Sequence, residues 1–353
     1  MVPEEWPIAA PAADRIVAPA RHAGRGRLAT VRHDFFLNPS ERLSEQERAL
    51  MTAMLHALVS DVADELRAAL PVSSSVANDD DNSELIAELS TAGLLDQPQL
   101  IELLLRQAGE EQIASAVKAR SGRREGRVLQ ALVSDDDPSI SAAAMALILA
   151  RGRRRDRFGQ TRLEFDDLPA EVAVALAFAT SAALRRRLTV TVDPQTADRQ
   201  LAAATAALLA RHDEDRRFEV MTAALVRLLD ENGKLDEDLI AAAADEGEIA
   251  LVAQALARRA GVLGADAMDL LVGGNSRGLM LLLRMAAVSR EFAARLLAGP
   301  GDLLGVTDAG REISRFDTLT HEEVDVAREW LRLDAAYRSA LAALGQGHGQ
   351  RFL

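Results

Sequence analysis

The sequence contains no cysteine and few aromatic residues. Without cysteine the chain cannot form disulfides, hold zinc or an iron–sulfur cluster through thiolates, or use a thiol as a nucleophile. Aromatic residues make up 3% of the chain, with a single tyrosine, and most apolar positions are alanine, leucine or valine. Strands favour aromatic and β-branched residues, whereas alanine and leucine are the strongest helix formers. The composition therefore predicts an all-α fold.

The chain also lacks a long apolar run and an excess of positive charge. The longest weakly polar stretch, residues 172–184, is too short to span a bilayer. The opening residues show no cationic leader followed by an apolar core, so we expect no signal peptide and a cytoplasmic protein. The formal net charge of −13 argues against coating nucleic acid as the main role, because that role requires a cationic face.

The two ends of the chain differ in composition from the rest. Residues 1–34 are rich in proline, alanine and arginine and have no apolar period, which predicts a disordered basic arm. Residues 346–353 form a short tail. A capping box of Ser44 and Glu47 predicts the start of a long amphipathic helix, which Pro71 ends. The folded part is therefore expected to begin shortly before Ser44.

An internal repeat follows this first helix. The stretch "GLLDQPQLIELL" from Gly93 matches "GVLGADAMDLLV" from Gly261 without a gap. Helix pairs of about this length can bury their apolar faces only by stacking on their neighbours, so the repeat predicts a HEAT-like, α-solenoid-like array of short helix pairs. Turn residues recur 28 to 30 residues apart in two runs, namely Gly93, Gly122 and Gly152, then Gly233, Gly261 and Ser289.

A break in the period near residue 190 divides the predicted array. We expect an N-terminal helical-repeat region at residues 35–190 and a C-terminal helical-repeat region at residues 191–345. The second region is predicted to close with a single helix. That helix begins at a capping box of Thr320 and Glu323 and ends at Gly345, since glycine commonly follows the last turn of a helix.

One motif is typical of a hydrolase. The stretch "GNSRG" around Ser276 has the spacing of a nucleophile elbow, and His321 follows it in the chain. A working elbow requires a strand of a parallel sheet before the serine. The residues before Ser276 match helical repeat copies, and the same slot is interpreted as a turn near Gly109 and Gly247. Ser276 is therefore interpreted as a turn residue, with a serine hydrolase as the disfavoured alternative.

No other pattern predicts a catalytic residue, a metal or a cofactor. The stretch "LLDENGKLDEDL" resembles a calcium loop around Gly233, but the first carboxylate and the final glutamate are missing, and Asp236 is interpreted as a helix cap. The six histidines do not occur at ligand spacing. His56 alone lies in the middle of a predicted helix, so histidine phosphotransfer stays open, although a surface histidine is the favoured interpretation.

Two arginine clusters stand out against the acidic background, "RGRRRDRFGQTR" at residues 151–162 and the arginines at 185–187. Guanidinium groups bind carboxylates and phosphates through paired donors. The alternatives are a solvated loop, or a nucleic-acid surface on which both clusters converge with Arg258 and Arg259. The first cluster lies where a repeat turn lengthens, and it supplies the candidate partner contacts Arg151, Arg153, Arg154, Arg155 and Arg157.

Three stretches of the chain resemble one family. They are "LSEQERALMTAMLHALVSDVADELRAAL", "LLDQPQLIELLLRQAGEEQIASAVKAR" and "RFEVMTAALVRLLDENGKLDEDLIAAAADEGEIALVAQALARRAG". Their apolar and glycine spacings resemble an alphaproteobacterial family catalogued as domain of unknown function 2336, over most of residues 35–345. The arginine-rich insertion near residue 151 departs from that pattern. The resemblance implies a helical, HEAT-like repeat protein and supplies no active-site residues.

These observations favour a non-enzymatic scaffold or regulatory adaptor. Stacked helix pairs form an extended concave surface of the kind that binds other proteins. We therefore expect a protein partner and no cofactor, and the sequence leaves homo-oligomers open. A helical-repeat protein that binds nucleic acid through converging arginines, and a hydrolase that uses Ser276, are the alternative functions.

Overall fold

The computed structural model describes residues 43–71, 79–121 and 126–344. Its contacts divide the chain into two units, Met1–Ser44 and Glu45–Leu353, and the description below concerns the second. The predicted arm at 1–34 and the tail at 346–353 lie outside the described residues. The predicted boundary between residues 190 and 191 falls in a turn between two helices and stays a prediction.

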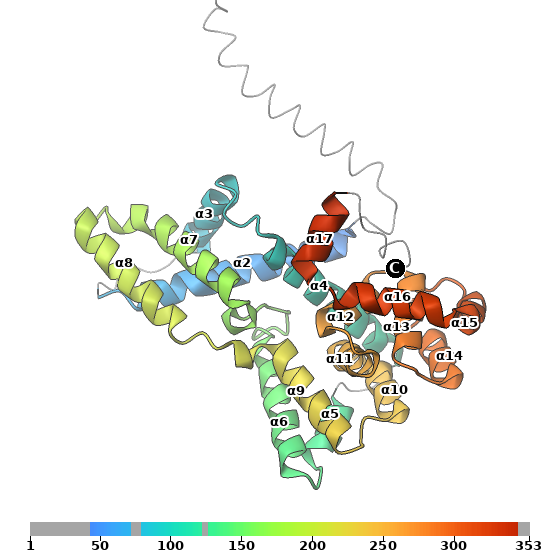
Figure 1. Ribbon diagram of the computed structural model, residues 1–353. Helices are drawn as coiled ribbons and strands as arrows, with labels where there is room; N and C mark the ends of the chain where they lie inside the picture. The colour runs from blue at the N-terminus through green and yellow to red at the C-terminus, as the bar shows by residue number, and fades with distance from the viewer. Residues whose placement is uncertain (1–42, 72–78, 122–125, 345–353) are drawn as a thin grey trace, which may run out of the picture. The chain divides into compact units, whose positions relative to one another are not determined.

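The described residues are almost entirely helical, which confirms the predicted all-α class. They contain no strand, and their only extended pairing is an isolated antiparallel bridge between Arg155 and Thr161. Figure 1 shows the α-helices in chain order, which are α2 (Glu45–Ala68), α3 (Asp79–Thr91), α4 (Pro98–Ser121), α5 (Arg127–Val133), α6 (Pro138–Arg153), α7 (Ala170–Leu188), α8 (Pro194–Leu209), α9 (Phe218–Glu231), α10 (Glu237–Glu246), α11 (Ile249–Ala260), α12 (Gly264–Val272), α13 (Ser276–Met285), α14 (Arg290–Ala298), α15 (Ala309–Thr318), α16 (His321–Arg332) and α17 (Ala335–Ala343).

The helix α4 contributes to two hydrophobic cores. Its first half, through Leu100 and Leu104, packs with α2, α3, α7 and α8. Its second half, through Ile113 and Val117, belongs to a larger core built mainly from α5, α6 and α9 to α16. All four side chains are at most 6% exposed. Burying one such side chain contributes about 1.5 to 3 kcal/mol, so α4 is held firmly from both ends.

Several predicted helix ends are confirmed. The helix α2 begins one residue after Ser44. The stretch "SDDDPS" at residues 134–139 predicts a helix cap with Pro138 in the first turn, and Asp137 indeed caps α6 by accepting the N–H groups of Ser139 and Ile140. Thr320 and Glu323 form the predicted capping box at the start of α16. Such caps satisfy backbone donors that a helix leaves unpaired at its start.

The single closing helix was a wrong prediction. The helix α16 ends at Arg332, Leu333 is extended, and α17 begins at Ala335. The cause is Asp334, whose carboxylate accepts hydrogen bonds from the N–H groups of Ala336 and Tyr337 and so starts a new helix. Val324, Ala327 and Leu331 of α16 are buried, whereas Leu341 of α17 is only half-buried.

The predicted glycine turns are confirmed in part. Gly93, Gly233 and Gly261 have φ values near +70°, as helix-ending turns require. Gly109 and Gly152 were wrongly predicted as turns, because they lie inside α4 and α6. A Cβ at Gly109 would lie 3.4 Å from a methyl group of Val272, so this glycine permits close packing of α4 against α12. Gly122 lies outside the described residues.

Candidate functional site

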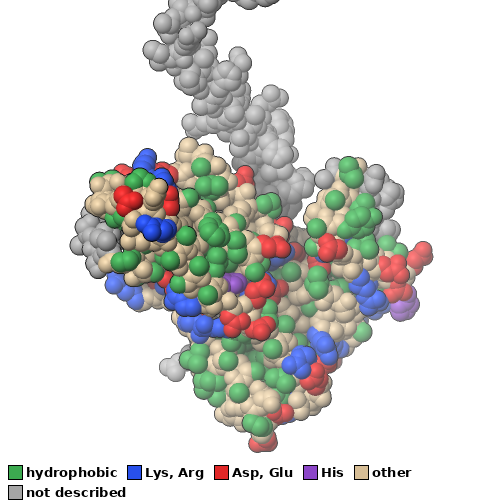
Figure 2. Space-filling model, turned by 60° about the vertical axis from the view of Figure 1, so that its left-hand side comes forward, with side chains coloured by type: hydrophobic (Ala, Val, Ile, Leu, Met, Phe, Trp, Pro, Cys, Tyr) green, Lys and Arg blue, Asp and Glu red, His purple; other side chains and the backbone are tan. Residues whose placement is uncertain are grey.

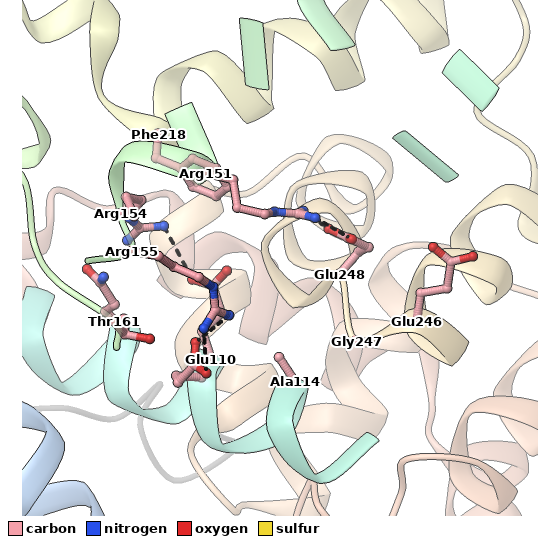
Figure 3. Close-up of a pocket in the computed structure, with 12 residues that line it drawn as sticks. Glu110, Ala114, Arg151, Arg154, Arg155, Thr161, Phe218, Glu246, Gly247 and Glu248 are labelled. Carbon is pink, nitrogen blue, oxygen red and sulfur yellow. Dashed lines mark hydrogen bonds and ion pairs between the residues drawn. The ribbon is translucent and has the colours of Figure 1, made fainter. Parts of the chain in front are cut away.

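Three of the five candidate arginines turn inward. Arg151 is in the last turn of α6, Arg154 and Arg155 directly follow the helix, and each of the three forms an ion pair with a carboxylate of another element. Arg153 and Arg157 are exposed. Figure 3 shows the inward three beside the cavity that they line with Glu110 and Glu248. The cluster therefore consists of three inner arginines with a structural role and two outer arginines that face solvent.

Arg151 joins α6 to the start of α11. Both terminal nitrogens of its guanidinium donate to the two carboxylate oxygens of Glu248, one of them over 2.7 Å. The Glu248 side chain is only 5% exposed. A buried carboxylate is strongly destabilising without its partner, so this bidentate pair holds the turn between α10 and α11 beside α6.

Arg154 and Asp167 organise the start of α9. The Nε atom of Arg154 lies 3.2 Å from Oδ2 of Asp167, and both side chains are largely buried. Oδ1 of Asp167 accepts the backbone N–H of Phe218 over 3.0 Å. The guanidinium of Arg154 also lies over the Phe218 ring, 4.4 Å from its centroid. The residue at the N-cap of α9 is Arg217, which makes no side-chain cap, so Asp167 takes that role from outside the helix.

Two small cavities lie beside these ion pairs and share Gln107, Glu110, Arg154 and Phe218. Each has a volume of about 60 Å³. Burial raises the pKa of Glu110, although the charges of Arg154 and Arg151 oppose the rise. Binding pockets for small organic ligands are typically about 300 to 1,000 Å³, so cavities of this size suit a few water molecules.

The loop after α6 is fixed and presents an aromatic side chain. Oδ1 of Asp156 accepts the N–H groups of Phe158 and Gln160, both over 2.8 Å. Arg155 pairs with Glu111 of α4 over 3.0 Å and closes the base of the loop. At the tip, Phe158 is 73% exposed, and the guanidinium of Arg157 lies over its ring at 4.7 Å. We call residues 153–160 the Phe158 loop.

The turn expected at Ser276 lies just before it, at residues 273–275. Ser276 itself is the first residue of α13, so its interpretation as a turn residue was wrong by one position, and the element before the turn is the helix α12 rather than a strand. Asn275 caps α13 with its side-chain oxygen, and Oγ of Ser276 lies 3.5 Å from a terminal nitrogen of Arg315. His321 is exposed at the start of α16. The backbone arrangement that a nucleophile elbow requires is therefore not found here.

The other arginines considered as nucleic-acid contacts are neutralised by carboxylates. Arg185 pairs with Asp198, Arg186 and Arg187 pair with Glu88, and Arg258 pairs with Asp230. Asp236 caps α10, as expected for the stretch that resembles a calcium loop. His56 is exposed on α2. In the three described segments, no histidine and carboxylate side chains gather at metal-binding distances, and no helix is long and apolar enough to cross a membrane.

Comparison with known proteins shows the family. A family model described as an uncharacterised protein conserved in bacteria (DUF2336) matches residues 87–323. The chain belongs to this family. The match runs from α3 into α16, so the DUF2336 region includes the inward arginines, both cavities and the Phe158 loop. No curated protein and no solved structure matches the chain. The alphaproteobacterial origin and the HEAT-like repeat stay predictions.

The carboxylates and the aromatic ring that shape this site do not stand out in the sequence. Glu111, Asp167 and Glu248 bind the inner arginines from positions 44, 13 and 97 residues away. Phe158 was not a candidate residue, because a single phenylalanine in a charged loop belongs to no repeating apolar pattern. One local signal was present, since Asp156 lies two residues before Phe158 and such a spacing favours an Asx turn.

Proposed function

We propose that this protein is a non-enzymatic cytoplasmic adaptor that binds a protein partner through the Phe158 loop. The observation that carries the proposal is the exposure of Phe158 at 73% in a loop whose base is fixed by ion pairs. A large apolar ring held in water is unfavourable in the free protein, and burial against a partner would remove that cost. Aromatic and arginine side chains dominate binding energy at protein interfaces.

The two exposed arginines of the cluster support the same proposal. Arg157 covers one face of the Phe158 ring, and Arg153 is exposed on the last turn of α6. The inner arginines restrict the loop before binding, so little conformational entropy remains to be lost when a partner docks. Arg153 and Arg157 are therefore proposed as direct contacts, whereas Arg151, Arg154 and Arg155 hold the loop in place.

Site-specific photo-crosslinking in cells tests this proposal. A photo-reactive phenylalanine analogue replaces Phe158, and the matched control carries it in place of Val190, which is 83% exposed in the turn between α7 and α8. We expect a discrete cross-linked protein product from position 158 and none from position 190. Equal or absent products at the two positions would contradict the proposal.

A charge reversal tests whether Arg157 contacts the partner directly or contributes only through the net charge of the protein. Arg157→Glu should reduce the cross-linked product several-fold when the analogue is at position 158. Arg311→Glu is the matched control, because Arg311 is an exposed arginine of α15. An equal loss from both reversals would point to net charge and not to the Phe158 loop.

A further inference from the structure

An open groove lies between the start of α7 and the end of α8. It is lined by the apolar side chains of Ala170, Val174 and Leu209, by His212, and by the acidic residues 213–215. Its volume is about 490 Å³, far larger than the two cavities beside the arginines. A cavity of about 150 Å³ already accepts a benzene molecule, so the groove has room for an aromatic side chain.

The apolar floor of the groove continues along α7. Val174 is 42% exposed and Phe178, one turn later on the same face, is 55% exposed. On the face brought forward in Figure 2, patches of apolar side chains lie beside acidic and basic ones. The groove therefore offers an exposed apolar surface that an inserted side chain could cover.

The rim of the groove carries negative charge that no cation pairs. Asp213, Glu214 and Asp215 are exposed, and none of the three forms an ion pair in the described segments. Glu214 accepts the backbone N–H of Ala170 at the start of α7 over 2.9 Å. The neighbouring arginines are already engaged, since Arg211 pairs with Glu65 and Arg216 pairs with Asp166. A binding segment that suits this groove therefore has an apolar anchor flanked by positive charge.

The Phe158 loop has this complementary chemistry. Its exposed ring is flanked by the exposed arginines Arg153 and Arg157. The loop does not line the groove of its own chain, and the ion pairs of Arg154 and Arg155 fix it elsewhere. The loop can therefore reach such a groove only in another molecule.

We propose that the α7–α8 groove binds the Phe158 loop of a second copy of this chain. The inference rests on the proposed function, because it names the partner of the same loop. Each copy carries one loop and one groove, so the surfaces that meet are different and the contact can join successive copies. Ion pairs between Arg153 or Arg157 of one copy and the rim carboxylates of the other would be solvent-exposed and screened by salt, so we expect association to weaken as ionic strength rises.

Sedimentation velocity with two complementary variants tests the pairing. Phe158→Glu disables the loop and leaves the groove intact, whereas Val174→Glu disables the groove and leaves the loop intact. We expect the average mass of the wild type to rise with concentration, and each variant alone to sediment as a single chain. An equimolar mixture should associate again, because one intact loop then meets one intact groove.

Controls keep this result interpretable. Val190→Glu is the control variant and should associate as the wild type does. Phe158, Val174 and Val190 are all exposed, so the helix content of each variant, measured by circular dichroism, should match that of the wild type. The inference is overturned if the wild type stays a single chain at every concentration. It is also overturned if either groove or loop variant associates normally, or if their mixture remains unassociated.

The cross-linked product from position 158 separates this inference from the proposed function. A product that contains two copies of this chain, joined between position 158 and peptides of α7 or α8, supports both. A product with a different protein overturns the self-association and leaves the adaptor proposal intact. The absence of any product contradicts both proposals.

Discussion

Asp167 accepts a hydrogen bond from the backbone N–H of Phe218, 51 residues later in the chain, and pairs with Arg154 through its other oxygen. One carboxylate thus caps the start of α9 and neutralises an arginine at the end of α6. Both functions are carried out at a side chain that is only 8% exposed. Arg154 belongs to the Phe158 loop, so this contact holds the base of the loop in place.

Asp167→Ala should therefore be strongly destabilising. The substitution removes the cap of α9 and leaves the mostly buried guanidinium of Arg154 without its nearest carboxylate. We expect the free energy of unfolding, measured by urea titration, to fall by about 3 kcal/mol or more. Asp166→Ala is the matched control, because Asp166 pairs with the half-exposed Arg216 and should contribute less than about 1 kcal/mol. Equal losses would contradict the role assigned to Asp167.

The buried ion pair of Arg151 and Glu248 should contribute more to stability than an exposed pair. Glu248→Gln leaves Arg151 facing an uncharged group in a largely buried site, so we expect a loss of about 3 kcal/mol in thermal or urea unfolding. Glu231→Gln tests an exposed pair, since Glu231 and Arg227 lie one helical turn apart with about half of each side chain exposed. That change should cost less than about 0.5 kcal/mol.

The raised pKa of Glu110 predicts a pH dependence. A carboxyl whose pKa is higher in the folded state than its ordinary value of 4.5 holds its proton more tightly when folded. This group therefore contributes a loss of stability as pH rises above 4.5 and through the folded pKa. We expect Glu110→Gln to gain stability relative to the wild type between acidic and neutral pH, as measured by urea unfolding across that range.

The opposite trend would show that the charges around Glu110 outweigh its burial. Arg154, Arg151, Glu248 and Glu111 are the charged groups that influence its pKa besides burial. If the ionised form were favoured by the two arginines, the wild type would gain stability relative to Glu110→Gln as pH rises.

Alanine substitutions at Gly93 and Gly247 should distinguish the cost of backbone strain from the cost of a steric clash. Gly93 and Gly247 have φ values of +71° and +76°, so alanine strains the backbone at both by about 1 to 2 kcal/mol. A Cβ at Gly93 meets nothing within 4 Å, whereas at Gly247 it would lie 3.0 Å from the Cα of Ala114 in α4. Gly247→Ala should therefore cost about 1 to 3 kcal/mol more than Gly93→Ala in urea unfolding.

The sequence predicted the features of this fold that depend on near neighbours. The all-α class and the caps at Asp137, Asp236 and Thr320 each follow from a few adjacent residues. Gly109 shows the limit of such reasoning, because a glycine in a helix allows close packing and a glycine after a helix allows a turn. Only the position of Val272, far along the chain, distinguishes the two roles.

The candidate site was predictable in location but not in organisation. The arginine run at 151–157 marked the loop, yet the run itself does not show which side chains turn inward. That division depends on Glu111, Asp167 and Glu248, which approach from three other elements. Patterns within one segment cannot report the placement of carboxylates that are distant in the chain. The sequence therefore did not indicate Phe158 as a candidate contact.

The position of Glu111 on α4 has a mechanical consequence. It binds Arg155 of the Phe158 loop, and it lies between Ala108, which packs in the first core, and Ile113, which packs in the second. A force on the loop is therefore transmitted to α4, the one helix among the described residues that contributes to both cores. Binding at the loop would in this way affect both cores, and the two cores are expected to unfold together.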